Sequence, residues 1–147
     1  MERASIYLFT DKNQYLIHSI STLSMGGGIA SPPYIWLDVN STDEELIQKL
    51  IYILNCSKTG LPRPADWNAS NKEYLQSIGL KKNKDLYTNS LLVEIFKKDD
   101  LIEFSSMVNM GRKGFLFKGP EFNITLPASS SAEELAEALK KAFSKCE

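Results

Sequence analysis

The sequence is poor in the side chains that most often carry catalysis or bind metals. It holds one histidine, His18, and two cysteines, Cys56 and Cys146, among 147 residues. Two cysteines without a Cys-x-x-Cys pair predict neither a disulfide framework nor a zinc site. His18 and the cysteines together supply too few ligands for a structural metal centre. We therefore expect no catalytic residue, no metal and no cofactor, and we interpret these three side chains as structural.

Long apolar runs and an excess of one charge are also missing. The longest apolar stretches are much shorter than the roughly 20 residues that a membrane-spanning helix needs. The N-terminus lacks the pattern of a secretory signal. Lys and Arg number 17 against 18 Asp and Glu, so the formal net charge is −1. A generic nucleic-acid-binding protein carries a basic excess. We therefore expect a cytoplasmic protein with reduced thiols that binds neither a membrane nor, directly, a nucleic acid.

The composition is that of an ordinary globular protein, with 43% hydrophobic and 24% charged residues. No proline-rich, glycine-rich or charged linker divides the chain, and its length matches one typical domain. We therefore predict a single domain over residues 1–147.

β-Branched and aromatic residues predict three strands in the first 40 residues. Ala4–Thr10 and Gln14–Ile20 form a predicted hairpin with a three-residue loop. Ser24–Pro33 contains three glycines and two prolines, so we expect an irregular segment there. The third strand is then predicted at Tyr34–Val39.

Three later segments have helical spacing. Asp43–Asn55 follows two overlapping capping boxes, Ser41 with Glu44 and Thr42 with Glu45. Asn71–Ile78 is a shorter predicted helix after an extended connector, Leu61–Trp67. The last helix begins at a third capping box, Ser131 with Glu134, and carries the predicted core stripe Leu135, Leu139, Ala142 and Phe143.

A second hairpin is predicted from Leu91–Phe96 and Leu101–Phe104, and a last strand from Phe122–Leu126. The elements follow the order βββ-αα-ββ(β)-α. Runs of strands that alternate with runs of helices are typical of an α+β fold. We therefore predict a mainly antiparallel sheet of about five or six strands with three helices.

Two charged clusters are candidate binding sites. Asp43, Glu44 and Glu45 begin the first predicted helix, and Asp66 lies in the connector after it. Acidic residues in a first turn complement the helix dipole, but they also offer a surface to a basic partner. Arg112 and Lys113 form the basic candidate, in a glycine-punctuated segment that runs on to Lys118.

The segment Lys113–Phe117 resembles the aromatic RNA-binding strand of the RRM fold, but the surrounding elements do not follow that fold's order. A glycine hinge before a strand is the simpler interpretation of the same residues. Nothing in the pattern indicates the paired carboxylates of a hydrolase, which need a cleft that raises one pKa. The sequence therefore favours a binding module over an enzyme.

A set of segments spread from Ser21 to Glu147 resembles the immunity proteins of bacterial contact-dependent growth inhibition (CDI) systems, the CdiI-type family. The most specific are Pro64-Ala65-Asp66-Trp67 and the terminal helix with its Glu-Leu and Ala-Phe pairs. The others are Ser21–Ser24 with the glycine run, Pro32-Pro33, Glu45-Leu46, Cys56–Gly60, Ile78–Lys81 and Gly111–Phe115.

The resemblance implies a small cytoplasmic protein that is not an enzyme and that binds the C-terminal toxin domain of a cognate CdiA effector. The toxins of such systems are often nucleases, and the immunity protein protects the producing cell. The family's motifs carry over no catalytic residue to this chain. Two alternatives stay open: an RNA-contacting or adaptor module that uses Arg112–Lys118, and a small enzyme that uses His18 or carboxylates.

Overall fold

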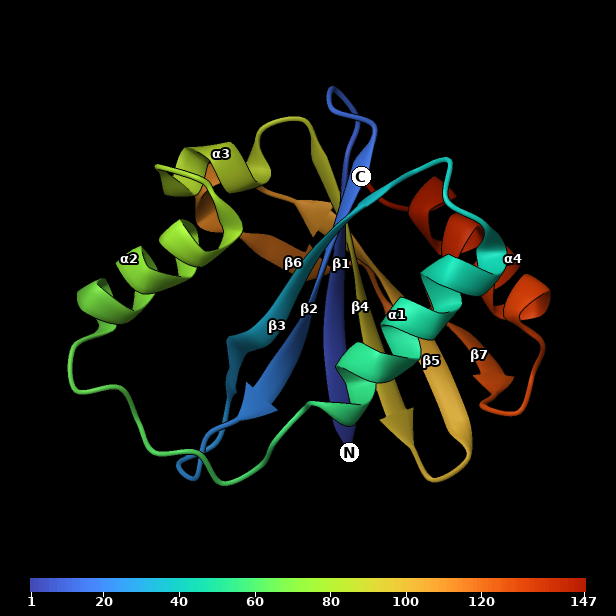
Figure 1. Ribbon diagram of the computed structural model, residues 1–147, viewed down its shortest axis with the longest axis horizontal. Helices are drawn as coiled ribbons and strands as arrows, with labels where there is room; N and C mark the ends of the chain where they lie inside the picture. The colour runs from blue at the N-terminus through green and yellow to red at the C-terminus, as the bar shows by residue number, and fades with distance from the viewer.

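The structure is a computed structural model that describes the whole chain, residues 1–147. Its centre is a seven-stranded sheet in the order β3-β2-β1-β4-β5-β6, with β7 also paired to β5, and every strand pair is antiparallel (Figure 1). The strands are β1 (Glu2–Phe9), β2 (Gln14–Thr22), β3 (Gly28–Asp38), β4 (Ser90–Lys98), β5 (Leu101–Asn109), β6 (Phe115–Phe117) and β7 (Ile124–Pro127). The helices are α1 (Asp43–Asn55), α2 (Trp67–Ile78), α3 (Asn83–Tyr87) and α4 (Ala132–Ser144).

This arrangement confirms the predicted α+β class and the mainly antiparallel sheet. It has seven strands and four helices where the sequence predicted about five or six and three. None of the helices is long and apolar enough to cross a membrane.

Helices α1 and α4 begin where their capping residues stand. The hydroxyl of Thr42 accepts a hydrogen bond of 3.1 Å from the amide of Glu45, so Thr42 is the N-cap and half of the second predicted box is formed. Ser131 and Glu134 form the complete capping box of α4. Caps of this kind satisfy backbone amides that have no partner within the helix.

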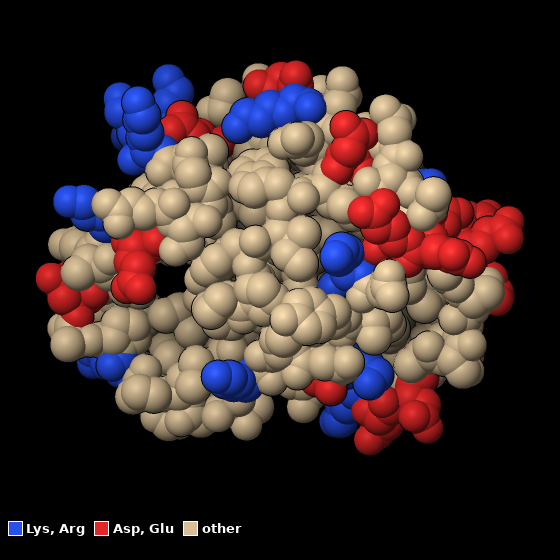
Figure 2. Space-filling view, in the orientation of Figure 1, with Lys and Arg blue, Asp and Glu red and all other residues tan.

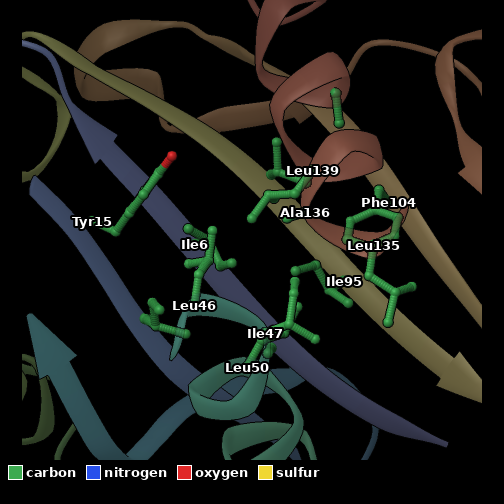
Figure 3. Packing of buried hydrophobic residues seen from close by; sticks show 14 of the residues in the cluster. Ile6, Tyr15, Leu46, Ile47, Leu50, Ile95, Phe104, Leu135, Ala136 and Leu139 are labelled. Carbon is green, nitrogen blue, oxygen red and sulfur yellow. The ribbon is translucent and has the colours of Figure 1, made fainter. Parts of the chain in front are cut away.

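The main core lies between one face of the sheet and helices α1 and α4. Side chains alternate along a strand, so Ala4 and Ile6 of β1 point to this face while Tyr7 and Phe9 point to the other. The core cluster contains 20 buried residues, several of which Figure 3 shows between the sheet and the two helices. Two serine hydroxyls tie the helices to the sheet, from Ser19 to the carbonyl of Ile53 and from Ser106 to that of Ala142.

A smaller core lies on the opposite face, under the end of α2 and the segment that follows it. It holds seven buried residues: Tyr7, Phe9, Leu16, Leu75, Ile78, Leu92 and Met107. The sheet is therefore covered on both faces, and β1 contributes side chains to both cores.

The third strand begins earlier than predicted. β3 starts at Gly28 and continues through Pro32 and Pro33, which the sequence analysis assigned to an irregular segment. The register with β2 shifts between His18 and Ser19, so both prolines fall outside the paired positions. Because β3 is an edge strand, it tolerates residues without an amide hydrogen.

Two further boundaries differ from the prediction, and two short elements were not predicted. α2 begins at Trp67, not Asn71, because Asp66 caps it, and the short helix α3 was not predicted. β6 lies inside the glycine-punctuated segment, and the last strand starts at Ile124 after a 3₁₀ turn, Pro120–Phe122. These elements are short or polar, so their hydrophobic pattern is weak.

The predicted stripe on α4 is buried, and Phe143 stacks on Tyr15 of β2 with ring centroids 5.8 Å apart. We expect Phe143→Ala to lower the free energy of unfolding by about 3–5 kcal/mol, because it leaves a cavity at the contact between helix and sheet. A urea titration measures this change. Lys141→Ala, on the exposed face of the same helix, is the control, and a loss below about 1 kcal/mol in Phe143→Ala would contradict this packing.

Candidate protein-binding surfaces

The first turns of α1 and α4 lie beside each other, which unites two acidic clusters that are far apart in the sequence. A cleft of about 500 Å³ between the two helix starts is lined by Thr42, Asp43, Glu44, Ser131, Ala132 and Glu133. Glu44, Glu45, Glu133 and Glu134 are exposed around it, and Figure 2 shows acidic side chains gathered on this side of the molecule. We call Asp43, Glu44, Glu45, Glu133 and Glu134 the acidic patch.

Within the acidic patch, Asp43 also has a structural partner. Its Oδ1 lies 3.0 Å from the ammonium group of Lys140 on α4, an exposed ion pair that links the two helices. The four glutamates of the patch form no ion pair. The patch therefore presents several uncompensated negative charges to a partner.

Asp66 is not part of this patch. It is the N-cap of α2, where its Oδ1 accepts hydrogen bonds from the amides of Asn68 and Ala69, at 2.9 and 3.2 Å. Figure 1 shows α2 at the opposite side of the molecule from the start of α1. The structure thus separates Asp66 from Asp43, Glu44 and Glu45, the three acidic residues with which it was predicted to form one site.

Arg112 and Lys113 lie in an exposed 3₁₀ turn, Gly111–Lys113, which neighbours α3. Lys118, at the end of the same segment, is held in place: its ammonium donates to the carbonyl of Lys145 at 2.8 Å and pairs with Glu147 at 3.1 Å. Phe115 packs edge-on against Tyr7, with centroids 5.6 Å apart. The first aromatic residue of the RNA-binding pattern is thus a packing residue.

A hollow that the sequence analysis did not predict lies between β3, the connector after α1 and helix α2. Its volume is about 710 Å³, and Figure 2 shows an opening through the molecule on the side where α2 lies. One side is the edge strand β3, which pairs with β2 only. The other side is a stripe of α2 at helical spacing: Trp67, Ser70, Asn71, Tyr74 and Ser77. Trp67, at the open end, is 45% exposed.

The sequence does contain a signal for this hollow. α2 buries only Leu75 and Ile78, both near its C-terminal end, and none of residues 67–73 is buried. A helix of 12 residues that packed along a sheet would carry an apolar stripe over its whole length. The positions at helical spacing before Leu75 are Asn71 and Asn68, which are polar, and this predicts a helix whose first half leaves the sheet.

A row of polar side chains crosses the sheet face that carries the smaller core. Cross-strand pairing places Tyr34, His18, Ser5, Glu94 and Ser105 opposite one another on five successive strands. The smaller core under the end of α2 lies on one side of this row and does not continue past it. Buried polar groups are costly unless they form hydrogen bonds, so each partner in the row matters.

His18 is 1% exposed and uses both ring nitrogens. Its Nδ1 lies 3.0 Å from the carbonyl oxygen of Ser19, which can only accept, so Nδ1 carries the proton. Nε2 then accepts a hydrogen bond of 3.0 Å from the hydroxyl of Tyr74. Burial lowers the pKa of His18 to about 4, so the ring is neutral at neutral pH. His18 is thus a buried side chain with a hydrogen-bond partner at each ring nitrogen.

The two cysteines lie at or just after the ends of helices α1 and α4. Cys146 packs against the main core, its thiol donates to the carbonyl of Leu92 at 3.2 Å, and burial raises the pKa of this thiol. Cys56 is the C-cap residue of α1. The histidine, cysteine and acidic side chains nowhere gather into a group of three that could hold a metal ion.

Glu94 is the one member of the polar row with a buried polar atom that has no hydrogen-bond partner. Its Oε1 accepts from the hydroxyl of Ser5 at 2.8 Å, but its Oε2 is buried without a hydrogen bond. Burial raises the pKa of Glu94 to about 7, against the smaller opposing effects of Ser5 and Arg3. The carboxyl group therefore takes up a proton more readily in the folded protein than in the unfolded chain.

This shift predicts a pH-dependent stability effect. Because the pKa is raised in the folded state from 4.5 to about 7, the contribution of Glu94 to stability is full at low pH and is lost as the pH rises through this range. Glu94→Gln should raise the free energy of unfolding at pH 8 by up to about 3 kcal/mol, at about 1.4 kcal/mol for each pKa unit. Urea titrations at pH 5 and pH 8 measure it, with Glu103→Gln on the next strand as control. An equal gain at both pH values would contradict the assignment.

Three comparisons relate this fold to known proteins. The family model described as CdiI, CDI immunity protein, matches residues 2–146. A protein of unknown function from Neisseria meningitidis, NMB0488, has the same fold with a TM-score of 0.80 and 18% identity, over 99% of this chain and 95% of that chain. A chain in the CdiA-CT/CdiI toxin and immunity complex from Yersinia pseudotuberculosis also matches with a TM-score of 0.80, at 17% identity, over 99% of this chain and 97% of that chain.

A search of the curated proteins found no match. The two solved structures agree with this chain in fold across nearly its whole length. The family model covers the same span, from the first strand to the end of the last helix. The chain therefore belongs to the family of CDI immunity proteins.

Proposed function

We propose that this protein binds and neutralises the C-terminal toxin domain of a cognate CdiA effector, a nuclease, in the cytoplasm of the producing cell. The match of the CDI immunity family model over residues 2–146 carries the proposal. The fold shared with a chain of a CdiA-CT/CdiI complex supports it. Protection would come from a stable protein–protein complex, without a reaction catalysed by this chain.

The hollow beside α2 is the surface best shaped to hold a projecting segment of the toxin. Its rim carries Trp67 and Tyr34, and aromatic side chains are common anchors of tight interfaces. The outer edge of β3 adds backbone groups that pair with no other strand. Asp66, at the cap of α2 beside Trp67, would supply a negative charge at the mouth of the hollow.

The acidic patch would act over a longer range. A nuclease carries a basic surface because it binds a polyanion, so the patch would attract it and speed association. Arg112 and Lys113 would contribute a separate contact near α3. The alternative in which Arg112–Lys118 binds RNA is weaker, because Lys118 is already engaged with the C-terminal residues.

The decisive experiment produces the toxin domain of the neighbouring CdiA effector gene in cells, with and without this protein. We expect growth arrest by the toxin alone, growth in the presence of both, and isolation of a one-to-one complex with a Kd near 1 nM, about −12 kcal/mol. Purified toxin should degrade nucleic acid, and this protein should stop it. The absence of both complex and protection would refute the proposal, whereas steeply salt-dependent binding to RNA alone would favour the alternative.

A charge variant tests the acidic patch. Replacing Glu44, Glu45 and Glu133 by Gln keeps the side-chain size and leaves the capping residues Thr42 and Ser131 in place. We expect toxin association to slow about tenfold at low salt and to change little at 0.5 M salt, where the charges are screened. Stopped-flow fluorescence measures the rate.

The control for this test is Glu121→Gln, an exposed carboxylate outside the patch and the hollow. Asp66→Asn, which retains a capping residue, tests the mouth of the hollow separately. A rate and a salt dependence equal to those of the unmodified protein would show that the three replaced glutamates serve only the two helices.

A further inference from the structure

Helix α2 is attached to the sheet at one end, and in its first half the side-chain amide of Asn71 donates a hydrogen bond of 3.0 Å to Asn83 at the start of α3. Leu75 and Ile78 are buried in its last turns, and the indole nitrogen of Trp36 donates a hydrogen bond of 3.1 Å to the carbonyl of Ile78. Residues 67–73 contain no buried side chain. The first half of α2 therefore extends beyond the sheet, with the hollow behind it (Figure 1).

Tyr74 stands where the attached half of α2 meets the projecting half. Its hydroxyl donates to Nε2 of His18, and its ring contacts the rings of His18 and Tyr34, with centroids 5.4 and 5.7 Å away. Its side chain also lines the hollow. Of the contacts that tie α2 to the sheet, this hydrogen bond is the one nearest the free end of the helix.

His18 is a rigid acceptor for this bond. The ring is buried, flanked by the rings of Tyr7 and Tyr34, and its other nitrogen is bonded to the carbonyl of Ser19. The bulge between β2 and β3 lies directly after His18, opposite the edge strand that forms the other wall of the hollow. His18 therefore contacts both walls of the hollow, through Tyr34 of β3 and Tyr74 of α2.

We propose that the hydrogen bond between Tyr74 and His18 sets the angle at which α2 leaves the sheet, and so sets the width of the hollow and the affinity for the toxin segment that enters it. Tyr74 is a positioning residue in this scheme. From Tyr74 to Trp67 the helix extends about 10 Å, at 1.5 Å per residue, so a small tilt at Tyr74 becomes a larger displacement at the rim. The effect on affinity rests on the proposed function, whereas the effect on α2 does not.

The first test measures amide hydrogen exchange by NMR in the free protein. Tyr74→Phe removes the hydroxyl and leaves Nε2 of His18 without its donor. We expect the amide exchange rates of residues 69–73 to become about tenfold faster, while those of α4 stay unchanged. Loss of one hydrogen bond shifts a local opening equilibrium by a factor of about 2–10, and by more when the remaining partner stays buried and unpaired. Tyr34→Phe, which removes a hydroxyl from the same aromatic group but not this bond, is the matched control. Equal exchange in Tyr74→Phe and Tyr34→Phe would overturn the positioning role.

The second test measures toxin affinity in two double-mutant cycles. If Tyr74 acts by placing the free end of α2, the variant that carries both Tyr74→Phe and Trp67→Ala should lose less affinity than the product of the two single fold-losses. The reason is that both substitutions disturb the same rim. The fold-losses in affinity from Tyr74→Phe and from Glu133→Gln, which lies in the acidic patch, should multiply when the two are combined. A purely global loss of stability would affect both cycles alike, and that result would overturn the proposal. If the unmodified protein bound no toxin, the proposed function would fail, and the exchange experiment alone would decide the role of Tyr74.

Discussion

Strand β1 is the constraint on which the rest of the structure depends. It is hydrogen-bonded along its length to β2 on one side and to β4 on the other, so its side chains must alternate between two covered faces. Ala4 and Ile6 enter the main core, while Tyr7 and Phe9 enter the smaller one. A shift of one residue in its register would exchange the two sets, and both layers of helices would lose their contacts.

The two faces of the sheet are used differently. On one face, α1 and α4 cover a continuous apolar core, and serine hydroxyls from β2 and β5 bind carbonyls near the ends of these helices. On the other face, the apolar cover stops at the polar row, and beyond it α2 stands away from β3. The well-packed face supplies the stability that allows the second face to keep polar side chains and an open hollow.

The polar row has an energetic cost that a purely structural sheet would avoid. Glu94 keeps one carboxylate oxygen without a hydrogen bond, and His18 is held neutral with its pKa near 4. Apolar residues at these positions would remove the cost. The bond from His18 to Tyr74, which lines the hollow, fits a surface in which α2 must be held at a defined distance from β3 without closing against it.

The local pattern of the sequence determined the elements with strong periodicity or clear caps. The hairpin of β1 and β2, the span of α1 from Asp43 to Asn55, and the buried stripe of α4 all agree with the structure, because capping boxes and apolar spacing act within a few residues. The family resemblance pointed to the class of protein that the family model confirms. The role of the acidic side chains stays a prediction.

Tertiary structure decided everything that depends on which segments meet. The sequence could not reveal that Glu133 lies beside Glu44, that Asp66 lies across the molecule from both, or that Tyr34, His18 and Glu94 share one register. These relations follow from strand pairing and helix packing between residues far apart in the chain. No local pattern encodes them, because pairing and packing are fixed only by the simultaneous burial of both faces of the sheet.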